Sequence, residues 1–421
     1  MRVAGVEDRP RIAVVGAGIG GLALAAALTA SGTRCEVFER ERESAGDGAG
    51  EELAPNAVRP LCRLGLGPVL RACAVRVEAT EIRGWDGRPV ARIPHGVPCE
   101  RLFGAPYYTV RHTDLRAALR AGVPAGALHT GRTVTGLTED ADGVTLHCAD
   151  GGTHRAHAVV GADGARSAVR AAISPETPAP RPAGLTVHQG LLPVERLPRA
   201  VARDALVRRW LGPGAHLVCY PVAGGAQVAF TATALRPDDP DAADAPGPAD
   251  QPADQGTAVA EPKDLVQDFG HWRGIPAQLA TAAARGAGTV RRLVPQEWEP
   301  PARWNTRRTA LLGDAAHPAL LLGPQGAAQA LEDAFDLAAC LAGEPRDGLP
   351  EALARYASLR APRVAAVEAA AREDGAGLLL PDGPEQRARD LALRGRSTLQ
   401  HLAPLYAYDT GRPGQGYATV G

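Results

Sequence analysis

The chain has 421 residues, of which 45% are hydrophobic and 22% charged, and its formal net charge at neutral pH is −1. So small a net charge creates no field that would attract nucleic acid or an anionic membrane, and we expect neither as a partner. The chain is longer than a single hydrophobic core usually requires, so two domains are expected.

The seven cysteines are scattered along the chain and form no C-x-x-C pair. This pattern favours reduced thiols in a cytoplasm over a disulfide framework or a zinc site, and we expect no bound metal. The N-terminal segment MRVAGVEDRP carries acidic side chains and lacks the apolar core of a signal peptide. The longest apolar run is interrupted by glycines, so no membrane span is expected.

A strand, a glycine-rich turn, a helix and a second strand follow one another over residues 12–39. We expect strands at 12–15 and 34–38, which are rich in β-branched and apolar residues, and an Ala- and Leu-rich helix at 22–30. The turn fits G-x-G-x-x-G. Its first glycine allows a tight turn, its second lets the backbone approach a pyrophosphate, and its third lets helix and strand pack closely. These glycines are Gly16, Gly18 and Gly21.

An acidic residue, Glu39, ends the second strand and is followed by Arg40. An acid at this place accepts hydrogen bonds from an adenosine ribose, and its charge would repel a 2′-phosphate. The pattern therefore predicts FAD or NAD rather than NADP at this site, and does not choose between the two. The alternative is a glycine-rich turn that binds nothing.

Further elements are expected in chain order up to the middle of the sequence. Residues 156–170 contain a strand, 158–160, that runs into a second glycine turn. Before it we expect a helix at 56–64, a pair of strands within 76–98, a helix capped by Thr113 or Asp114, and strands at 132–137 and 143–148 joined by a hairpin turn.

Residues 184–235 alternate apolar and polar side chains between turn signals and predict a β-meander. The segment 236–262 consists mainly of Asp, Ala and Pro, too polar to offset its ordering entropy, so a mobile surface insert is expected. A helix at 263–272 and a strand at 289–293 should return the chain to the first domain. A strand ending at Gly313-Asp314 and a long helix from about Gln325 come next.

Three glycine-centred turns, at 16–21, 161–164 and 313–326, each follow a short apolar strand. In a doubly wound sheet a cofactor lies at the carboxyl ends of the strands. Asp163 and Asp314 could there accept hydrogen bonds from ribitol or ribose hydroxyls. Each aspartate could instead cap the helix that follows it.

The three motifs GAGIGG with Glu39, GADGARSAVR, and LLGDAAHP with QGAAQALEDAFDLA resemble the flavin motifs of the group A FAD-dependent monooxygenases. These enzymes share the para-hydroxybenzoate hydroxylase fold. Further segments resemble the salicylate hydroxylase-like branch, so that the resemblance covers most of the chain outside 236–262. They are APNAVRPLCRLGL, VRHTDL, HLVCYPVAGG, DFGHWRGIP, ARYASLRAPRV and LYAYD.

The resemblance implies an α/β fold in which a Rossmann-type FAD-binding domain (1–75, 100–180 and 290–345) is interrupted by a mainly β-sheet substrate domain (76–99 and 181–289). C-terminal helices and a tail occupy 346–421. The implied cofactor contacts are those of the glycine turn and Glu39 with adenosine diphosphate, of Arg111 with the pyrophosphate, and of Asp314 with ribitol or pyrophosphate. Gln325, Gly326 and Ala327 would face the isoalloxazine, and Asp163 and Arg166 belong to a motif associated with both FAD and NAD(P)H.

The implied reaction uses NADH or NADPH as a transient electron donor and O2 as the oxidant. A C4a-hydroperoxyflavin would hydroxylate or epoxidise an aromatic or polycyclic small molecule, in a monomer or homodimer. Two alternatives remain at this point: a reductase or dehydrogenase on the same fold, and a flavin-binding regulatory protein without turnover.

A side chain that deprotonates a phenol would raise the electron density of the ring. The candidates on the expected substrate sheet are His188, Gln189 and Tyr220. His188 and Gln189 must lie on opposite faces of their strand, so at most one faces the flavin. We interpret His317 as structural. Arg208 and Arg209 could bind a substrate carboxylate or belong to a solvated strand face.

Several positions depart from the family pattern. Glu51-Glu52 places charge where a branched aliphatic residue is usual beside the isoalloxazine. Leu321 stands in place of a proline, and Gly323-Pro324 precedes Gln325 where glycine or alanine is commoner. These changes predict an altered substrate pocket.

Overall fold

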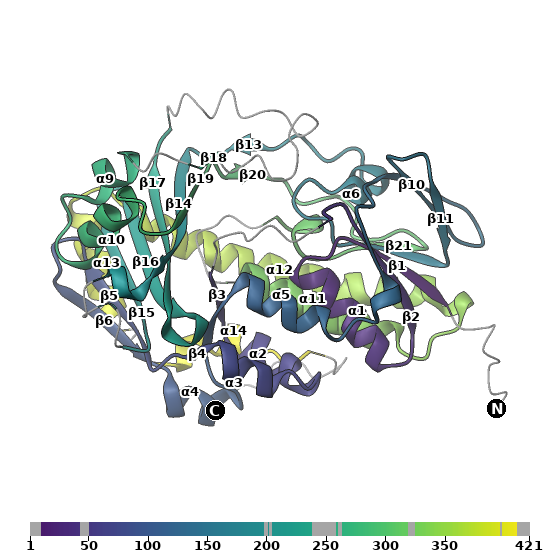
Figure 1. Cartoon of the computed structure of the whole chain (residues 1–421), viewed down its shortest axis with the longest axis horizontal. Helices are drawn as coiled ribbons and strands as arrows, with labels where there is room; N and C mark the ends of the chain where they lie inside the picture. The colour runs from purple at the N-terminus through teal and green to yellow at the C-terminus, as the bar shows by residue number, and fades with distance from the viewer. Residues whose placement is uncertain are drawn as a thin grey trace.

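The structure, a computed structural model, describes residues 10–42, 50–197, 201, 204–237, 258–259, 263–318, 325–395 and 398–410. Two sheets occupy opposite sides of the molecule (Figure 1). The long helices α11 (Gly326–Leu341) and α12 (Leu349–Leu378) run between them. No helix in these described ranges is both long and apolar enough to cross a membrane.

The first sheet is parallel and has the strand order β21-β12-β1-β2-β8. Successive side chains of these strands point to opposite faces of the sheet, and the two faces belong to two separate hydrophobic cores. One face packs against α1, α5 and α11, and the other against the small antiparallel sheet β9–β11 and α6. The elements are β1 (Arg11–Val15), α1 (Ile19–Ala30), β2 (Arg34–Glu39), α5 (His112–Arg120), β8 (Leu128–Thr130), β9 (Val134–Glu139), β10 (Val144–Cys148), β11 (Thr153–Ala156), β12 (Ala158–Gly161), α6 (Ala168–Ile173) and β21 (Thr309–Leu311).

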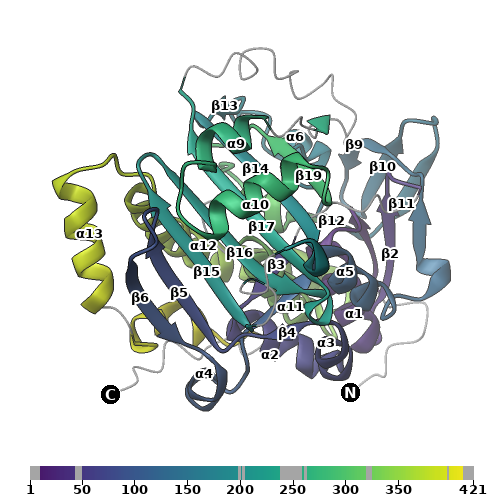
Figure 2. The same cartoon turned by 60° about the vertical axis from the view of Figure 1, so that its left-hand side comes forward.

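The second sheet has eight strands in the order β18-β19-β14-β17-β16-β15-β5-β6. Helices α9 (Lys263–Phe269) and α10 (Ile275–Ala284) cover one of its faces (Figure 2). The other face packs on aromatic side chains from α4 and from the C-terminal segment. The strands are β5 (Ala79–Gly84), β6 (Pro89–Pro94), β14 (Leu185–Pro193), β15 (Leu206–Gly212), β16 (Ala215–Val222), β17 (Gln227–Leu235), β18 (Ala258–Val259) and β19 (Thr289–Leu293).

A third sheet, β3 (Gly50–Leu53), β7 (Tyr108–Arg111) and β4 (Val75–Arg76), lies between the other two. It matters for function because β3 carries Glu51 and Glu52. The remaining elements are α2 (Pro55–Arg63), α3 (Gly67–Cys73), α4 (Gly96–Phe103), β13 (Arg181–Pro182), β20 (Gln296–Glu297), α13 (Pro384–Gly395) and α14 (Ala403–Tyr406).

The structure corrects three expectations about these elements. β14 pairs along its whole length with β17, so only β15, β16 and β17 form a meander. β19 pairs with β14, so the expected boundary at residue 290 cuts through a strand of the large sheet. The helix α5 starts after Arg111, not at Thr113 or Asp114, and no side chain caps it. Most of the expected insert 236–262 lies outside the described residues.

Candidate active site

The three strands that precede the glycine turns, β1, β12 and β21, are parallel neighbours in the first sheet. Their carboxyl ends therefore share one edge. Gly16 adopts φ +106°, and a Cβ atom there would lie 2.2 Å from the carbonyl oxygen of Ala162 in the second turn. A Cβ on Gly21 would lie 2.1 Å from the carbonyl oxygen of Gly16. Glycine is required at both positions, because the backbone segments at this edge of the sheet pack too closely to leave room for a Cβ atom.

Gly18 and Gly326 differ from the other two glycines because each faces open space. A Cβ on either residue would meet no atom of the described residues within 4 Å, apart from the residue's own neighbours in the chain and its own helix. Gly18 precedes α1 and Gly326 begins α11, and the N-terminus of a helix presents free N–H groups and a partial positive charge. The edge thus offers two open helix ends, which fit the pyrophosphate and the ring of a bound FAD.

Glu39 lies beside the first glycine turn, as its place at the end of β2 predicts. Its carboxylate accepts hydrogen bonds from the backbone N–H of Ala17 at 2.6 Å and of Glu41 at 2.9 Å. Arg40 is exposed. The arginine that contacts this turn is one that the sequence did not single out. Arg116 of α5 donates from Nε to the carbonyl oxygen of Ala17 at 2.8 Å.

Arg111, at the end of β7, is held by a carboxylate of the following helix. Its guanidinium donates to both carboxylate oxygens of Asp114, at 2.7 and 2.6 Å, and to Oε1 of Gln227 at 3.3 Å. A role of Arg111 at the pyrophosphate therefore stays a prediction.

Asp163 organises the second turn. It accepts hydrogen bonds from Oγ of Ser167 at 2.5 Å and from the N–H of Val169 at 3.2 Å, and Ser167 in turn caps α6. This geometry matches the helix-capping alternative. The buried Arg170 was missed in the sequence. It donates to the carbonyl oxygens of Asp314 (3.2 Å) and Ala315 (3.0 Å), and thereby joins the second turn to the third.

Asp314 follows β21, and its side chain reaches accessible space. Protein atoms on its other sides remove solvent and raise the pKa of the carboxyl group, and the nearby Glu51 carboxylate raises it further. Gln325 precedes the first turn of α11, and its Oε1 accepts weakly from Asn56 at 3.4 Å. Ala327, in that turn, packs partly against the core.

A buried ionic cluster supports the start of α11 from beneath. The fully buried guanidinium of Arg360 donates to Glu332 at 2.6 Å and to Asp333 at 2.7 Å. Asp333 also accepts from Nε2 of His317 at 2.6 Å and from the N–H of Gly313 at 2.8 Å. Burial acts to raise the pKa of Asp333, but His317 and Arg360 outweigh it and lower that pKa to about 2. These contacts fix the third turn and hold His317, which also lines the cavity at the start of α11.

A cavity of about 750 Å³ extends from the start of α11 to the large sheet. Its lining includes Gln325 and Gly326 at the start of α11 and Arg209 of β15. Ile82, Ile93 and Leu211 give it apolar strand walls. The other walls come from α12, α13 and residues 401–406.

The C-terminal segment 399–410 is fastened across this cavity by arginines of two helices. Arg363 of α12 donates to the carbonyl oxygens of Pro404 at 2.6 Å and Leu405 at 3.1 Å. Arg59 of α2 donates to the carbonyl oxygen of Tyr406 at 2.8 Å. These contacts hold the segment in place along one side of the cavity.

The cavity is lined by a carboxyl group and a guanidinium that lie close together. Glu52 is 8% exposed, and its Oε2 accepts from the hydroxyl of Tyr107 at 2.7 Å. Its Oε1 lies 4.0 Å from Nη2 of Arg209. Burial raises the pKa of Glu52, and Arg209 and Tyr107 oppose this rise. His95 stacks on Tyr107, and burial lowers its pKa to about 4, so its imidazole is neutral at pH 7.

Comparison with known proteins agrees with this geometry. The family described as "FAD binding domain" matches residues 9–371. The chain belongs to this family and is a group A flavoprotein monooxygenase. One relative, "3-amino-4-hydroxybenzoate 2-monooxygenase" of Streptomyces cremeus, is 43% identical and aligns over 97% of this chain and 98% of its own. Another, "3-hydroxybenzoate 6-hydroxylase" of Klebsiella oxytoca, is 31% identical over 92% and 93%.

Two solved structures carry the same fold. HpxO of Klebsiella pneumoniae, complexed with FAD and uric acid, has a TM-score of 0.80 and 27% identity, with 93% of this chain and 94% of that chain covered. A salicylate hydroxylase substrate complex has a TM-score of 0.76 and 25% identity, with 96% of both chains covered. The expected cofactor FAD, the fold and the oxygenation of an aromatic small molecule are therefore confirmed.

The structure of the monooxygenase corrects the choice of His188 as a catalytic base. His188 shares its face of β14 with Leu192, which packs with Leu265 of α9 in the core under α9 and α10. Burial lowers the pKa of His188 to about 4. The side chain therefore lies on the side of the sheet opposite the cavity.

Gln189 and Tyr220 lie on the cavity side of the sheet, but they are not among the described residues that line the cavity. Tyr220 is buried, and a Cβ on Gly50 would lie 2.8 Å from its ring. Arg208, the other alternative for carboxylate binding, pairs with Asp204 instead. Leu321 and Pro324 lie outside the described residues.

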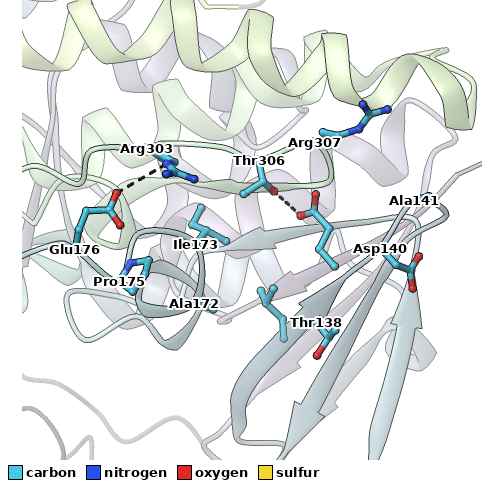
Figure 3. A pocket seen from close by; sticks show the side chains of 12 residues that line it. Thr138, Asp140, Ala141, Ala172, Ile173, Pro175, Glu176, Arg303, Thr306 and Arg307 are labelled. Atoms are coloured by element: carbon cyan, nitrogen blue, oxygen red, sulfur yellow. Dashed lines mark hydrogen bonds and ion pairs between the residues drawn. The ribbon is translucent and has the colours of Figure 1, made fainter.

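A second depression lies on the outer surface beside β9 and α6. Figure 3 shows Arg303 extended toward Glu176, with 3.8 Å between Nε and Oε1, and Thr306 hydrogen-bonded to Glu139. It shares no described lining residue with the cavity. We assign it no part in the oxygenation.

Sequence reasoning recognised Glu52 only as a departure from the family pattern and did not single out Tyr107 or His95. Tyr107 and His95 stand in segments without a motif. Arg208 and Arg209 point to opposite faces of β15, and the sequence did not show which face lies toward the cavity. Only the LYAYD segment indicated in the sequence that residues 401–406 take part in the site.

Proposed function

We propose that this monooxygenase hydroxylates an amino-hydroxybenzoate, with 3-amino-4-hydroxybenzoate as the first substrate to test. The observation that carries the proposal is the cavity at the start of α11, whose lining combines Glu52 and Arg209 with apolar strand residues. A small aromatic acid with both donor and acceptor substituents suits such a cavity. The activity named for the Streptomyces cremeus relative supports the same class.

The reaction consumes one substrate, NAD(P)H, a proton and O2, and yields the hydroxylated ring, NAD(P)⁺ and water. Bound FAD supplies the redox chemistry, since it takes two electrons from NAD(P)H and delivers one oxygen atom of O2 to the ring. The chain holds the substrate in the cavity, keeps water out with the segment 399–410, and directs the positive end of α11 toward the ring of the flavin.

Oxygen consumption tests the proposal. Purified protein with FAD should oxidise NADH or NADPH faster when 3-amino-4-hydroxybenzoate is added, and O2 uptake should match the hydroxylated product measured by mass spectrometry. Benzoate serves as the control, because it lacks both the amino and the hydroxyl group. If 3-amino-4-hydroxybenzoate stimulates neither NAD(P)H oxidation nor O2 uptake, the substrate class is wrong.

The state of assembly and the location of the protein stay predictions. We propose a monomer or homodimer that acts in the cytoplasm, and the seven free cysteines support a reducing compartment.

A further inference from the structure

The pair formed by Glu52 and Arg209 is incompletely satisfied. The 4.0 Å between Oε1 of Glu52 and Nη2 of Arg209 is too long for a hydrogen bond. Nε of Arg209 is buried and has no hydrogen-bond partner among the described residues. A buried charge is costly when its hydrogen-bonding groups are unused. Because Glu52 and Arg209 both line the cavity, the 4.0 Å gap between them points to a ligand that bridges the two side chains.

The ligand must offer a donor and an acceptor close together, because the carboxylate can only accept and the guanidinium can only donate. Adjacent amino and hydroxyl groups on an aromatic ring meet this requirement. The amino group donates an N–H, and the hydroxyl oxygen, most strongly when ionised, accepts. A carboxylate on the opposite side of the ring cannot reach the same pair.

The chemistry of the proposed reaction gives the amino group a second purpose. Hydroxylation at position 2 of 3-amino-4-hydroxybenzoate occurs at a carbon next to the one that bears the amino group. The amino lone pair increases the electron density there, whereas the hydroxyl group is meta to this carbon. A carboxylate that accepts an N–H of the amino group strengthens that electron donation without removing the proton.

We propose that Glu52 accepts a hydrogen bond from the substrate amino group while Arg209 donates to the adjacent hydroxyl oxygen. This inference rests on the proposed function and adds the residue that selects and activates the ring. Tyr107 positions Glu52, since its hydroxyl holds Oε2 and leaves Oε1 directed toward Arg209.

The test uses the FAD-loaded full-length protein and the variant Glu52→Gln. The amide keeps an oxygen for Tyr107, so the variant should fold and bind FAD normally. Dissociation constants for 3-amino-4-hydroxybenzoate and 4-hydroxybenzoate come from the change in flavin absorbance on binding. The wild type should prefer the amino compound by about tenfold or more, and E52Q should reduce this ratio to about one. The kcat of E52Q for the amino compound should fall as well.

Glu368→Gln is the matched control, because Glu368 lines the same cavity from α12 but pairs with Arg372 at 3.2 Å. It should leave the ratio unchanged. An unchanged ratio in E52Q would overturn the assignment of Glu52. If the wild type neither binds nor hydroxylates 3-amino-4-hydroxybenzoate, the proposed function fails first, and the role of Glu52 fails with it.

Arg209→Gln tests the other half of the pair. It should weaken binding of both 4-hydroxy compounds and spare 3-aminobenzoate, which lacks the hydroxyl group. Equal loss of 3-aminobenzoate binding would place the substrate carboxylate at Arg209 and overturn the assignment of the hydroxyl.

Discussion

Substitution of Gly18 by alanine should weaken FAD binding strongly while leaving the apoprotein stable. Gly18 has φ −71° and ψ −175°, which alanine also adopts, and the added methyl group would meet no atom within 4 Å in the described part of the chain beyond its sequence neighbours. Alanine is a poorer helix N-cap than glycine by less than about 1 kcal/mol. A gain of about 0.4–1 kcal/mol from the stiffer unfolded chain offsets this loss. The free energy of unfolding should therefore change by about 0.5 kcal/mol or less.

The substitution should lower the affinity for FAD, because the new methyl group occupies the space in which the pyrophosphate must approach the backbone. We expect FAD to bind at least about 30-fold more weakly, equivalent to about 2 kcal/mol. Flavin fluorescence titration measures this affinity, and urea unfolding of the apoprotein measures its stability.

Gly16→Ala is the contrasting variant. At φ +106° and 2.2 Å from the carbonyl oxygen of Ala162, its Cβ forces the backbone to move, so the apoprotein itself should lose about 2 kcal/mol or more. If Gly18→Ala bound FAD as tightly as the wild type, the open space at Gly18 would not be the pyrophosphate site, and the reasoning from the glycine pattern would be wrong.

His188→Ala should leave substrate-stimulated O2 uptake unchanged, because the side chain faces α9; slower uptake in a variant that unfolds at the wild-type temperature would return His188 to the mechanism. The buried Asp333 should make the protein sensitive to acid. Its pKa is about 2 in the folded protein and near 3.8 when unfolded, so its contribution of about 2 kcal/mol is present above about pH 4 and is lost as the pH falls toward 2. Urea unfolding across this range should show a steeper fall for the wild type than for Asp333→Asn, and parallel curves would contradict the assignment.

The parts of the fold that could be predicted were those set by local pattern. The strand, glycine turn and acid of residues 12–39 are specified by neighbours in sequence, and β1, α1 and β2 form there. The partner of β14 could not be read in the same way, because pairing with β17 depends on contacts distant in sequence. That pairing and the position of α9 determine that His188 points to the face of the large sheet that α9 covers. The sequence therefore placed the glycine turn and Glu39 side by side, but it could not place the residues that line the substrate cavity.

The residues that line the cavity are spread along the whole chain, and this affects how the protein can fold during translation. Four of the five strands of the first sheet lie before residue 162, whereas the substrate cavity draws its walls from residue 52 through residue 406. Chains emerge from the ribosome N-terminus first, so the nucleotide-binding core can assemble while the cavity still lacks the segment that Arg59 and Arg363 hold. A nascent or truncated chain would therefore have an open oxygenation site, and only the finished polypeptide can couple electron transfer to a sheltered ring.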